Sequence, residues 1–172
     1  VNTWSEESLA DIIYGYGEER FAKRIARGIV EARRKSKIKT TFDLVKIIEE
    51  AIPAKFRKGR IHFATKTFQA IRIAVNDELG ALAEGLSKGF DALKVGGRMS
   101  VISFHSLEDR IVKKFYKAKA EEGKAILIPA RNATHNVAGG NKKVILANEE
   151  EVRNNPRSRS AKLRILEKTH AM

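Results

Sequence analysis

The segment VISFHSLEDR, residues 101–110, places a histidine, a serine and two carboxylates next to one another. Its first four residues are typical of a buried strand, and its last six are typical of the start of a helix. In an open α/β sheet, ligands bind in the crevice at the carboxyl ends of the strands. This turn is therefore a candidate wall of an active site, with a well-capped helix as the alternative.

The capping alternative explains most of the polar residues in this turn. Ser106 and Asp109 have the spacing of a capping box, in which each side chain bonds to the other residue's backbone N–H. Glu108 also favours a first helical turn, because carboxylates there interact well with the helix dipole. Capping does not explain His105, which we expect at the last strand position with its side chain projecting into the crevice. Both interpretations remain open at this point.

Other common catalytic arrangements have no support in the sequence. The four histidines, His62, His105, His135 and His170, are far apart, and there is no cysteine, so we expect no metal site. No G-x-S-x-G, G-x-x-x-x-G-K-[ST] or G-x-G-x-x-G pattern is present. The glycine pairs Gly96-Gly97 and Gly139-Gly140 are typical of turns. The chain therefore contains no phosphate or nucleotide cradle of its own.

The charge balance indicates a polyanionic partner. The 172 residues include 34 Lys and Arg against 21 Asp and Glu, a net charge of +13. Such an excess favours nucleic acid, although a basic surface that is merely tolerated is the alternative. Residues 55–72 contain no acid, which favours contact with a polyanion. Near the C-terminus four cations alternate and could all face a phosphate backbone: Arg157, Arg159, Lys162 and Arg164. The alternatives are a solvated loop for the first group and a charged strand edge for the second.

Hydrophobic periodicity predicts helices over residues 1–75. The first follows a Thr3–Glu6 capping box and ends near Gly15 and Gly17, and the second covers about 18–34. A third starts at Thr40 or Thr41 and ends at Pro53, because proline cannot continue a helix. One long helix should then carry a core-facing stripe, which comprises Phe68, Ile71, Val75, Leu79, Leu82 and Leu86.

The second half of the chain has the pattern of an α/β sheet. The run MSVISF, residues 99–104, shows no alternation, which favours a strand buried on both faces of a parallel sheet. A helix should follow over 105–120. Short strands are predicted in AILIPA (125–130) and KKVILA (142–147), and a final strand in SAKLRILEK (160–168). No run approaches the ~18 apolar residues of a membrane span, and the N-terminus has no signal-peptide pattern.

Four motifs carry a resemblance to a known family. YGYGEERFAKRIARGIVEAR, TFQAIRIAVNDEL, GGRMSVISFHSLEDRIVKKF and NPRSRSAKLR occur in this order. Together they resemble the bacterial S-adenosylmethionine-dependent methyltransferases that methylate N4 of a cytosine in the decoding centre of 16S ribosomal RNA. The resemblance extends from about Trp4 to Thr169. One departure is HFATKTFQ, residues 62–69, where the family has H-P-A-T-R-T-F-Q; Lys66 in place of arginine gives up a bidentate contact.

The resemblance implies a Rossmann-like methyltransferase domain interrupted by a helical insertion. Residues 1–75 would be most of the insertion, and residues 76–172 would be the C-terminal part of the sheet domain. The family's glycine-rich S-adenosylmethionine loop and its ribose-binding acid would lie upstream, so we expect no cofactor-binding residue in this chain. Since the chain begins at Val1, we interpret it as a fragment. A truncated, non-catalytic RNA-binding paralogue is the alternative, and a basic structural protein is a third reading.

The resemblance also implies partners and site residues. The partner would be 16S rRNA in the small ribosomal subunit, in the cytoplasm and away from membranes; a homodimer is left open. Ser103, His105 and Ser106 are the catalytic candidates, because they would border the crevice that the target base enters. Trp4 would offer a stacking surface. The remaining RNA-binding candidates are Lys55, Arg57, Lys58, Arg60, His62, Lys66, Arg72, Arg157 and Arg159.

Overall fold

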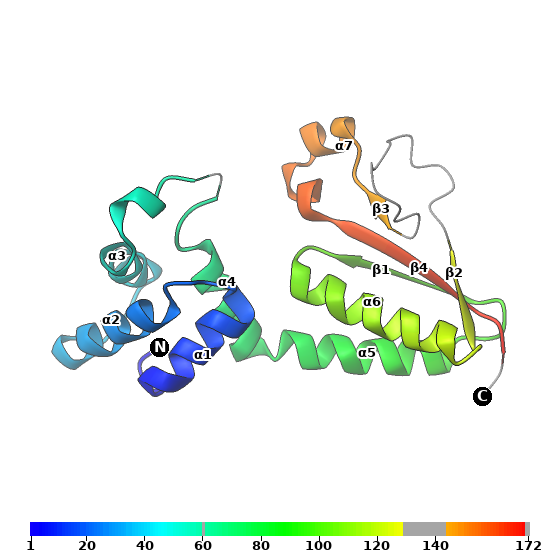
Figure 1. Ribbon diagram of the computed structural model, residues 1–172, viewed down its shortest axis with the longest axis horizontal. Helices are drawn as coiled ribbons and strands as arrows, with labels where there is room; N and C mark the ends of the chain where they lie inside the picture. Colours follow the sequence, from blue (N-terminus) through cyan, green and yellow to red (C-terminus); the bar gives the residue numbers. More distant parts are fainter. Residues whose placement is uncertain (60, 129–143, 171–172) are drawn as a thin grey trace. The chain divides into compact units, whose positions relative to one another are not determined.

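The computed structural model describes residues 1–59, 61–128 and 144–170 (Figure 1). The chain forms two compact units, Val1–Glu78 and Leu79–Met172. The boundary that the sequence suggested lay slightly earlier, between residues 75 and 76. The assignment of the first unit to a helical insertion and of the second to a Rossmann-like domain stays a prediction.

The first unit is entirely helical in its described residues. It contains α1 (Glu6–Gly17), α2 (Ala22–Lys35), α3 (Thr41–Ala51), the short 3-10 helix η1 (Ala54–Phe56) and α4 (Thr65–Asn76). Helix α1 packs against α2 and α4, and α2 packs against α3. The core between them is aliphatic, with Leu9, Ile13, Ile25, Ile29 and Ile48 fully buried. These helices therefore owe their stability to one shared apolar core rather than to helix propensity alone.

The ends of these helices follow local capping only in part. The prediction for α3 is confirmed: Thr40 and Asp43 form a reciprocal capping box, and the helix stops before Pro53. The predicted start of α1 is wrong, because Ser5 and not Thr3 is its N-cap, with its side chain accepting from the backbone N–H of Ser8. Gly15 does not interrupt α1, which continues to Gly17 because the apolar face of the helix is still packed there.

The second helix starts later than the sequence pattern suggested. Glu18 adopts a left-handed conformation (φ 49°) at the C-terminus of α1, and α2 begins only at Ala22. Glu18 and Glu19 are therefore residues of a turn, not of a first helical turn.

The single long helix predicted between Phe68 and Leu86 is also wrong. Asp77 has a positive φ of 48° and its backbone N–H donates to Ile73, so α4 ends there and α5 (Glu78–Ala92) begins anew. The apolar stripe does not run unbroken through the break: Leu86 is buried, whereas the Val75 side chain is 66% exposed. A left-handed residue changes the helix axis, which periodicity alone does not reveal.

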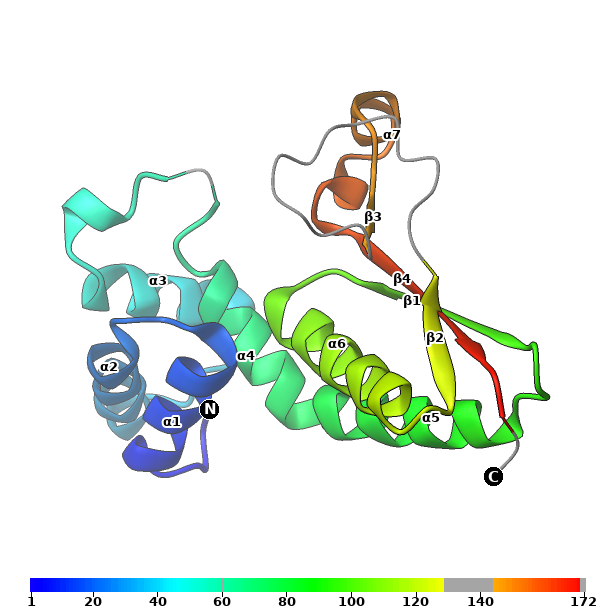
Figure 2. The same ribbon diagram turned by 45° about the vertical axis from the view of Figure 1, so that its right-hand side comes forward.

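The second unit is a small antiparallel sheet with helices. Besides α5, it contains β1 (Arg98–Ser103), α6 (Ser106–Glu121), β2 (Ala125–Ile128), β3 (Ile145–Leu146), α7 (Glu149–Asn154), η2 (Pro156–Ser160) and β4 (Lys162–Lys168). Strand β4 pairs antiparallel with β1, with β2 and with β3, so it is the central strand (Figure 2). The positions of the predicted strands and of the helix after β1 are thus confirmed. The intervening loop, with Gly139 and Gly140, lies outside the described residues.

Two expectations about β1 are wrong. The strand pairs antiparallel with β4, not in a parallel sheet. It is also buried on one face only, since Met99, Val101 and Ser103 point inward while Ser100 and Ile102 are exposed. The hydrophobic run hid this alternation, because an isoleucine occupies an outward position and a serine an inward one.

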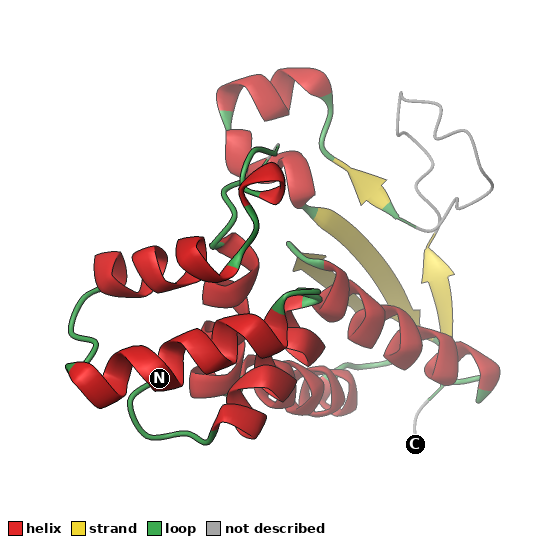
Figure 3. Ribbon diagram, turned by 60° about the vertical axis from the view of Figure 1, so that its left-hand side comes forward, coloured by secondary structure: helices red, strands yellow, loops and turns green. Residues whose placement is uncertain are grey.

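The core of the second unit lies between α5, α6 and one face of the sheet (Figure 3). Phe90, Val112, Tyr116 and Leu166 are fully buried there. The Tyr116 hydroxyl donates to the Met99 carbonyl (2.9 Å), and burial raises the pKa of this phenol well above its ordinary value. In the described residues, no helix is both long enough and apolar enough to span a membrane.

Candidate functional site

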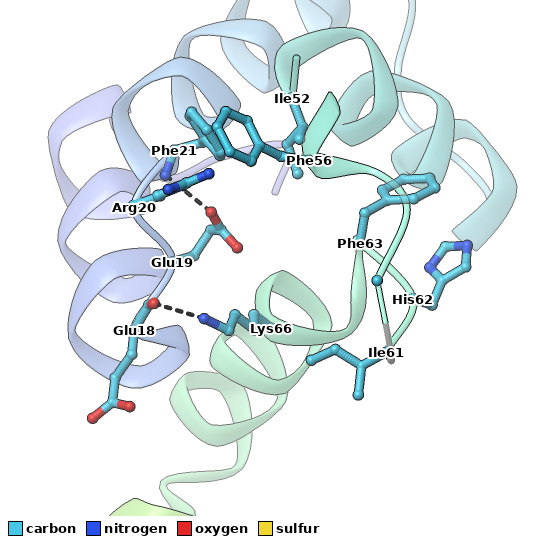
Figure 4. Close-up of a pocket in the computed structure, with 11 residues that line it drawn as sticks. Glu18, Glu19, Arg20, Phe21, Ile52, Phe56, Ile61, His62, Phe63 and Lys66 are labelled. Carbon is cyan, nitrogen blue, oxygen red and sulfur yellow. Dashed lines mark hydrogen bonds between the residues drawn. The ribbon is translucent and has the colours of Figure 1, made fainter. Parts of the chain in front are cut away.

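A pocket of about 260 Å³ lies in the helical unit (Figure 4). The turn between α1 and α2 forms one side, and the segment from the end of α3 to the first turn of α4 forms the other. The lining residues combine aromatic rings with charges of both signs: Glu18, Glu19, Arg20, Phe21, Ile52, Phe56, Gly59, Ile61, His62, Phe63 and Lys66. Cations beside exposed aromatic rings are the usual features of a site for single-stranded nucleic acid.

The left-handed conformation of Glu18 decides which acid faces the pocket. The carboxylate of Glu18 points away from the cavity, whereas that of Glu19 points into it (Figure 4). Glu19 is only 7% exposed. Its Oε1 accepts from the backbone N–H of Phe21 (3.0 Å), immediately before α2. One carboxylate oxygen is thereby anchored at the pocket wall.

Arg20 lies on a platform of two aromatic rings. Its guanidinium carbon is 3.7 Å from the centroid of Phe56 and 4.7 Å from that of Phe21. The two rings are themselves in contact, with centroids 5.3 Å apart. A guanidinium over an aromatic face is attracted by the ring's electron density. This contact holds the positive charge of Arg20 at the wall of the pocket.

The opposite wall carries His62, Phe63 and Lys66. The rings of His62 and Phe63 are stacked, 4.2 Å between centroids. The Nδ1 atom of His62 accepts from the backbone N–H of Ala64 (3.2 Å), so the neutral ring carries its proton on Nε2. The Lys66 ammonium donates to the Glu18 carbonyl (3.1 Å) and so bridges the two sides of the pocket. Lysine suffices for this single acceptor, where the family pattern has arginine.

The basic residues predicted to contact RNA fall into two groups. Lys55 and Lys58 are exposed. Arg57 instead donates to the Ile52 carbonyl (2.8 Å), and Arg72 binds the carboxylate of Glu78 through two hydrogen bonds (2.7 and 3.0 Å). Arg60 lies outside the described residues. RNA contacts by the whole group stay a prediction, but the structure already accounts for two of the arginines by internal bonds.

Trp4 and the C-terminal arginines do not line this pocket. The Trp4 side chain is partly buried against the core of the helical unit. Arg157 and Arg159 are exposed on η2 in the second unit. Their roles toward RNA stay predictions.

The turn between β1 and α6 has a different capping pair from the one predicted. His105 is the N-cap of α6, and its Nδ1 accepts from the backbone N–H of Glu108 (3.4 Å). In return, Glu108 Oε2 accepts from the backbone N–H groups of Phe104 (2.8 Å) and His105 (3.3 Å). The Ser106–Asp109 capping box is therefore wrong by one residue. Capping explains His105, which the sequence interpretation had set apart as unexplained.

The Asp109 side chain takes no part in the cap of α6, because it forms a buried ion pair instead. Its carboxylate receives two hydrogen bonds from Arg164 (2.8 and 3.2 Å) and one from Lys162 (3.3 Å). The suggestion that Arg164 faces a phosphate backbone is thus wrong, since Arg164 is 7% exposed on the central strand. Nearby, the buried Ser103 hydroxyl donates to the Lys162 carbonyl (3.4 Å). Catalytic roles for Ser103, His105 and Ser106 stay predictions; the geometry gives the first two structural tasks.

This capping arrangement leads to a prediction about stability. His105→Ala removes the N-cap acceptor of α6 and should lower the free energy of unfolding by about 1 kcal/mol. Ser106→Ala should change it by less than about 0.5 kcal/mol, because Ser106 is an exposed first-turn residue without a capping bond. Urea denaturation of both variants measures the difference. A larger loss for Ser106→Ala would restore the original capping assignment.

Two kinds of observation in the described residues bear on a metal or cofactor site. Within residues 1–59, 61–128 and 144–170, no three His, Asp or Glu side chains are grouped as metal ligands. After β1, the backbone N–H groups of Phe104 and His105, which could hold a carboxylate or ribose oxygen, are bonded to Glu108. A β-carbon on Gly97 would lie 2.8 Å from the Lys94 carbonyl, so this glycine serves a tight turn. These two turns therefore do not fit S-adenosylmethionine, and the position of the cofactor pocket stays a prediction.

Comparison with known proteins decides the family. Residues 1–169 match the model of the MraW methylase family. The chain belongs to this family. Curated relatives include the ribosomal RNA small subunit methyltransferases H of Lactobacillus johnsonii (48% identical over 98% of this chain) and Methylococcus capsulatus (52% over 97%). That of Persephonella marina is 50% identical over 96%. The alignments cover 54%, 55% and 52% of these relatives, so the chain spans about half of their length.

The pocket shows what the sequence reading missed in this MraW family chain. Glu19, Arg20, Phe21, Phe56 and Phe63 were not among the site candidates. The signal was present in the stretch GEERF, residues 17–21, where a glycine and two acids precede an Arg-Phe pair. Assigning those acids to a helix hid the turn that directs Glu19 inward.

Proposed function

We propose that the chain is part of a ribosomal RNA methyltransferase that transfers a methyl group from S-adenosylmethionine to N4 of a cytosine in the decoding centre of 16S rRNA. The observation that carries the proposal is the family match over residues 1–169, supported by relatives whose names describe small-subunit rRNA methylation. Because the chain spans about half of those relatives, the activity is proposed for the whole protein. The partner would be the small ribosomal subunit, in the cytoplasm. A homodimer stays an untested option.

Within this function, the helical unit would bind the RNA. Its pocket places Arg20 and Lys66 beside the rings of Phe56 and Phe63. Cations neutralise phosphates, and aromatic faces stack on unpaired bases. The net charge of +13 supports the same role. By contrast, the two turns beside β1 do not fit the cofactor, and we assign no methyl-transfer step to them.

The reaction requires the RNA-binding part of the enzyme to bind the substrate RNA and to orient the target base. The lone pair on cytosine N4 is delocalised into the ring, so the amine is a weak nucleophile. Methyl transfer therefore depends on holding the base in an in-line position, which accounts for several kcal/mol in well-oriented reactions (roughly 7–11). The base must also leave its stack before an enzyme can act on it. A chain that binds unpaired RNA next to the reacting base would help to hold that base out of its stack and in position.

A chimera tests the proposed function. The aligned half of the Lactobacillus johnsonii relative is replaced by these 172 residues, and the purified chimera is incubated with small-subunit rRNA and S-adenosylmethionine. We expect N4-methylcytidine in the nucleoside digest by mass spectrometry, at a rate within about tenfold of the relative. A folded chimera that binds the cofactor but forms no methylated nucleoside would contradict the proposal.

The second candidate function is RNA binding without catalysis. The specific observation in its favour is that the described residues form a basic, aromatic pocket but no cofactor cradle. An inert chimera together with tight binding of small-subunit rRNA by the 172-residue chain would select this function.

A further inference from the structure

Helix α2 and the residues beside it carry much of the positive charge of the chain. Residues 20–39 contain nine Lys and Arg and a single acid, Glu31, which is a net charge of +8 out of +13 for the whole chain. The helix lies along one side of the helical unit, next to α1 and α3 (Figure 1). Its apolar face, with Ile25 and Ile29 fully buried, packs into the core. The opposite face therefore presents its cations to solvent.

The exposed cations of α2 form one strip, here termed the α2 strip. Its members are Lys23, Arg24, Arg27, Arg34 and Lys35. With 3.6 residues and 5.4 Å per turn, they fall within about 120° of the helix circumference and extend over roughly 18 Å. Among the described residues, four of the five have no ion-pair partner, and Arg27 lies 3.7 Å from Glu6, with both side chains largely exposed. Such an exposed pair contributes little.

The needs of the helix itself do not account for this arrangement. Cations near the C-terminus of a helix interact well with its dipole, which explains Arg34 and Lys35. Lys23 and Arg24 lie instead in the first turn, where the dipole disfavours positive charge and where α2 has no acid. Lys23 also lies four residues before Arg27, a like-charge spacing that destabilises a helix. A bound polyanion would relieve this repulsion.

The residue types of the α2 strip distinguish between kinds of polyanion. Sites for single-stranded nucleic acid combine cations with aromatic rings on which bases stack, and the strip contains no aromatic residue. Double-stranded RNA is recognised mostly by its shape and by contacts to phosphates and 2′-hydroxyls, for which a rigid row of cations suffices. A membrane surface is excluded, because the apolar face that would enter it is buried in the core.

We propose that the α2 strip binds the phosphate backbone of a double-stranded segment of RNA. This surface is separate from the aromatic pocket, whose rings suit unpaired bases. The inference rests on the proposed function, in that it takes RNA as the partner. It adds that the helical unit recognises a duplex next to the unpaired region, so that the fold of the RNA contributes to its selection.

The test compares two fluorescent RNAs on the complete 172-residue chain. One is a duplex of about 16 base pairs, the length that a double-stranded RNA-binding domain covers, and the other is an oligouridine strand of the same length. The triple variant Lys23→Gln, Arg27→Gln, Arg34→Gln should bind the duplex at least about tenfold more weakly. Its slope of log K against log salt should fall by roughly 0.9 per contact, about 2–3 in total. Glutamine has a helix propensity close to that of lysine and arginine, so α2 should persist.

A control variant and a gain of affinity complete the test. Replacing Lys94, Lys113 and Lys114 of the second unit by glutamine removes the same charge and should weaken duplex binding clearly less. Glu31→Gln removes the one acid among the cations of α2 and should tighten duplex binding about two- to threefold. Glu150→Gln, an exposed acid of α7, should tighten it less. A gain of affinity cannot arise from unfolding.

The outcomes separate this inference from the proposed function. Equal losses of duplex binding in the two triple variants, or binding of the single strand alone, overturn the role of the α2 strip and leave RNA binding intact. An oligoglutamate that displaces the duplex as well as unlabelled duplex does, at equal charge, would assign the strip to an acidic protein instead. If thermal melts show that the first triple variant is unfolded, the comparison of Glu31→Gln with Glu150→Gln decides, and equal affinities overturn the inference. Absence of binding to either RNA contradicts the proposed RNA-binding role and this inference together.

Discussion

Replacing Arg164 by methionine is expected to lower the free energy of unfolding by about 3–5 kcal/mol. Asp109 and Arg164 are 9% and 7% exposed, and the guanidinium makes two hydrogen bonds to the carboxylate. Methionine fills a similar volume but leaves the buried carboxylate with Lys162 as its one cationic partner among the described residues. Lys162 approaches from the more exposed side at 3.3 Å. The loss of stability comes mainly from the buried Asp109 carboxylate that is left without its arginine, and less from the lost attraction between the two charges. Urea denaturation near pH 7 measures it.

Two further variants test whether the loss of stability comes from the buried charge of Asp109. Arg159→Met removes an exposed arginine of η2 and should change the free energy of unfolding by less than about 0.5 kcal/mol. The double variant Asp109→Leu, Arg164→Met removes both buried charges and should recover most of the loss, because a buried ion pair is often replaceable by apolar groups. A single variant Arg164→Met that loses less than 1 kcal/mol would show that water reaches Asp109.

The same ion pair sets a dependence on pH. Burial alone would raise the pKa of Asp109, but the hydrogen bonds and charge of Arg164, aided by Lys162, outweigh burial and hold the pKa below its ordinary value. A lowered pKa in the folded state means that the carboxylate stabilises the fold above the unfolded pKa of about 3.9. This contribution is lost as the pH falls through the lower folded value. Acid titration of stability should therefore show a smaller loss below pH 4 in the double variant.

Neutralising three lysines of the stretch 55–72 is expected to change the salt dependence of RNA binding. Lys55, Lys58 and Lys66 are exposed and belong to the acid-free stretch of the helical unit. If each contacts a phosphate of single-stranded RNA, replacing all three by glutamine should reduce the slope of log K against log salt by roughly 0.7 per contact, about 2 in total. Fluorescence titrations at several salt concentrations measure the slope and the accompanying loss of affinity.

A matched triple variant controls for net charge. Lys94, Lys113 and Lys114 are exposed lysines of the second unit, and their replacement by glutamine removes the same three charges. We expect a clearly smaller change in slope for this control. Equal changes in both variants would indicate a diffuse attraction between a basic protein and RNA. An unchanged slope in the first variant would identify the stretch as a solvated loop.

The sequence alone determined those features that depend on neighbouring residues. Thr40, Asp43 and Pro53 set the limits of α3, because a capping box and a proline act within one helical turn. The succession of β1, α6 and β4 was also readable, and the four motifs identified the family that the comparison confirmed. Local chemistry is sufficient for such features, since the residues that decide them are adjacent in the chain.

The tertiary structure decided the features that depend on distant partners. Asp109 looks like a capping residue until Arg164, 55 positions later, is brought beside it by β4. With Asp109 engaged there, His105 and Glu108 form the cap. The antiparallel order of the sheet likewise depends on which strand returns to β1. Glu19 enters the pocket only because the left-handed Glu18 ends α1 and because the segment before α4 closes over it. Contacts between residues far apart in sequence stabilise these arrangements, and a local sequence pattern does not show which distant residues will meet.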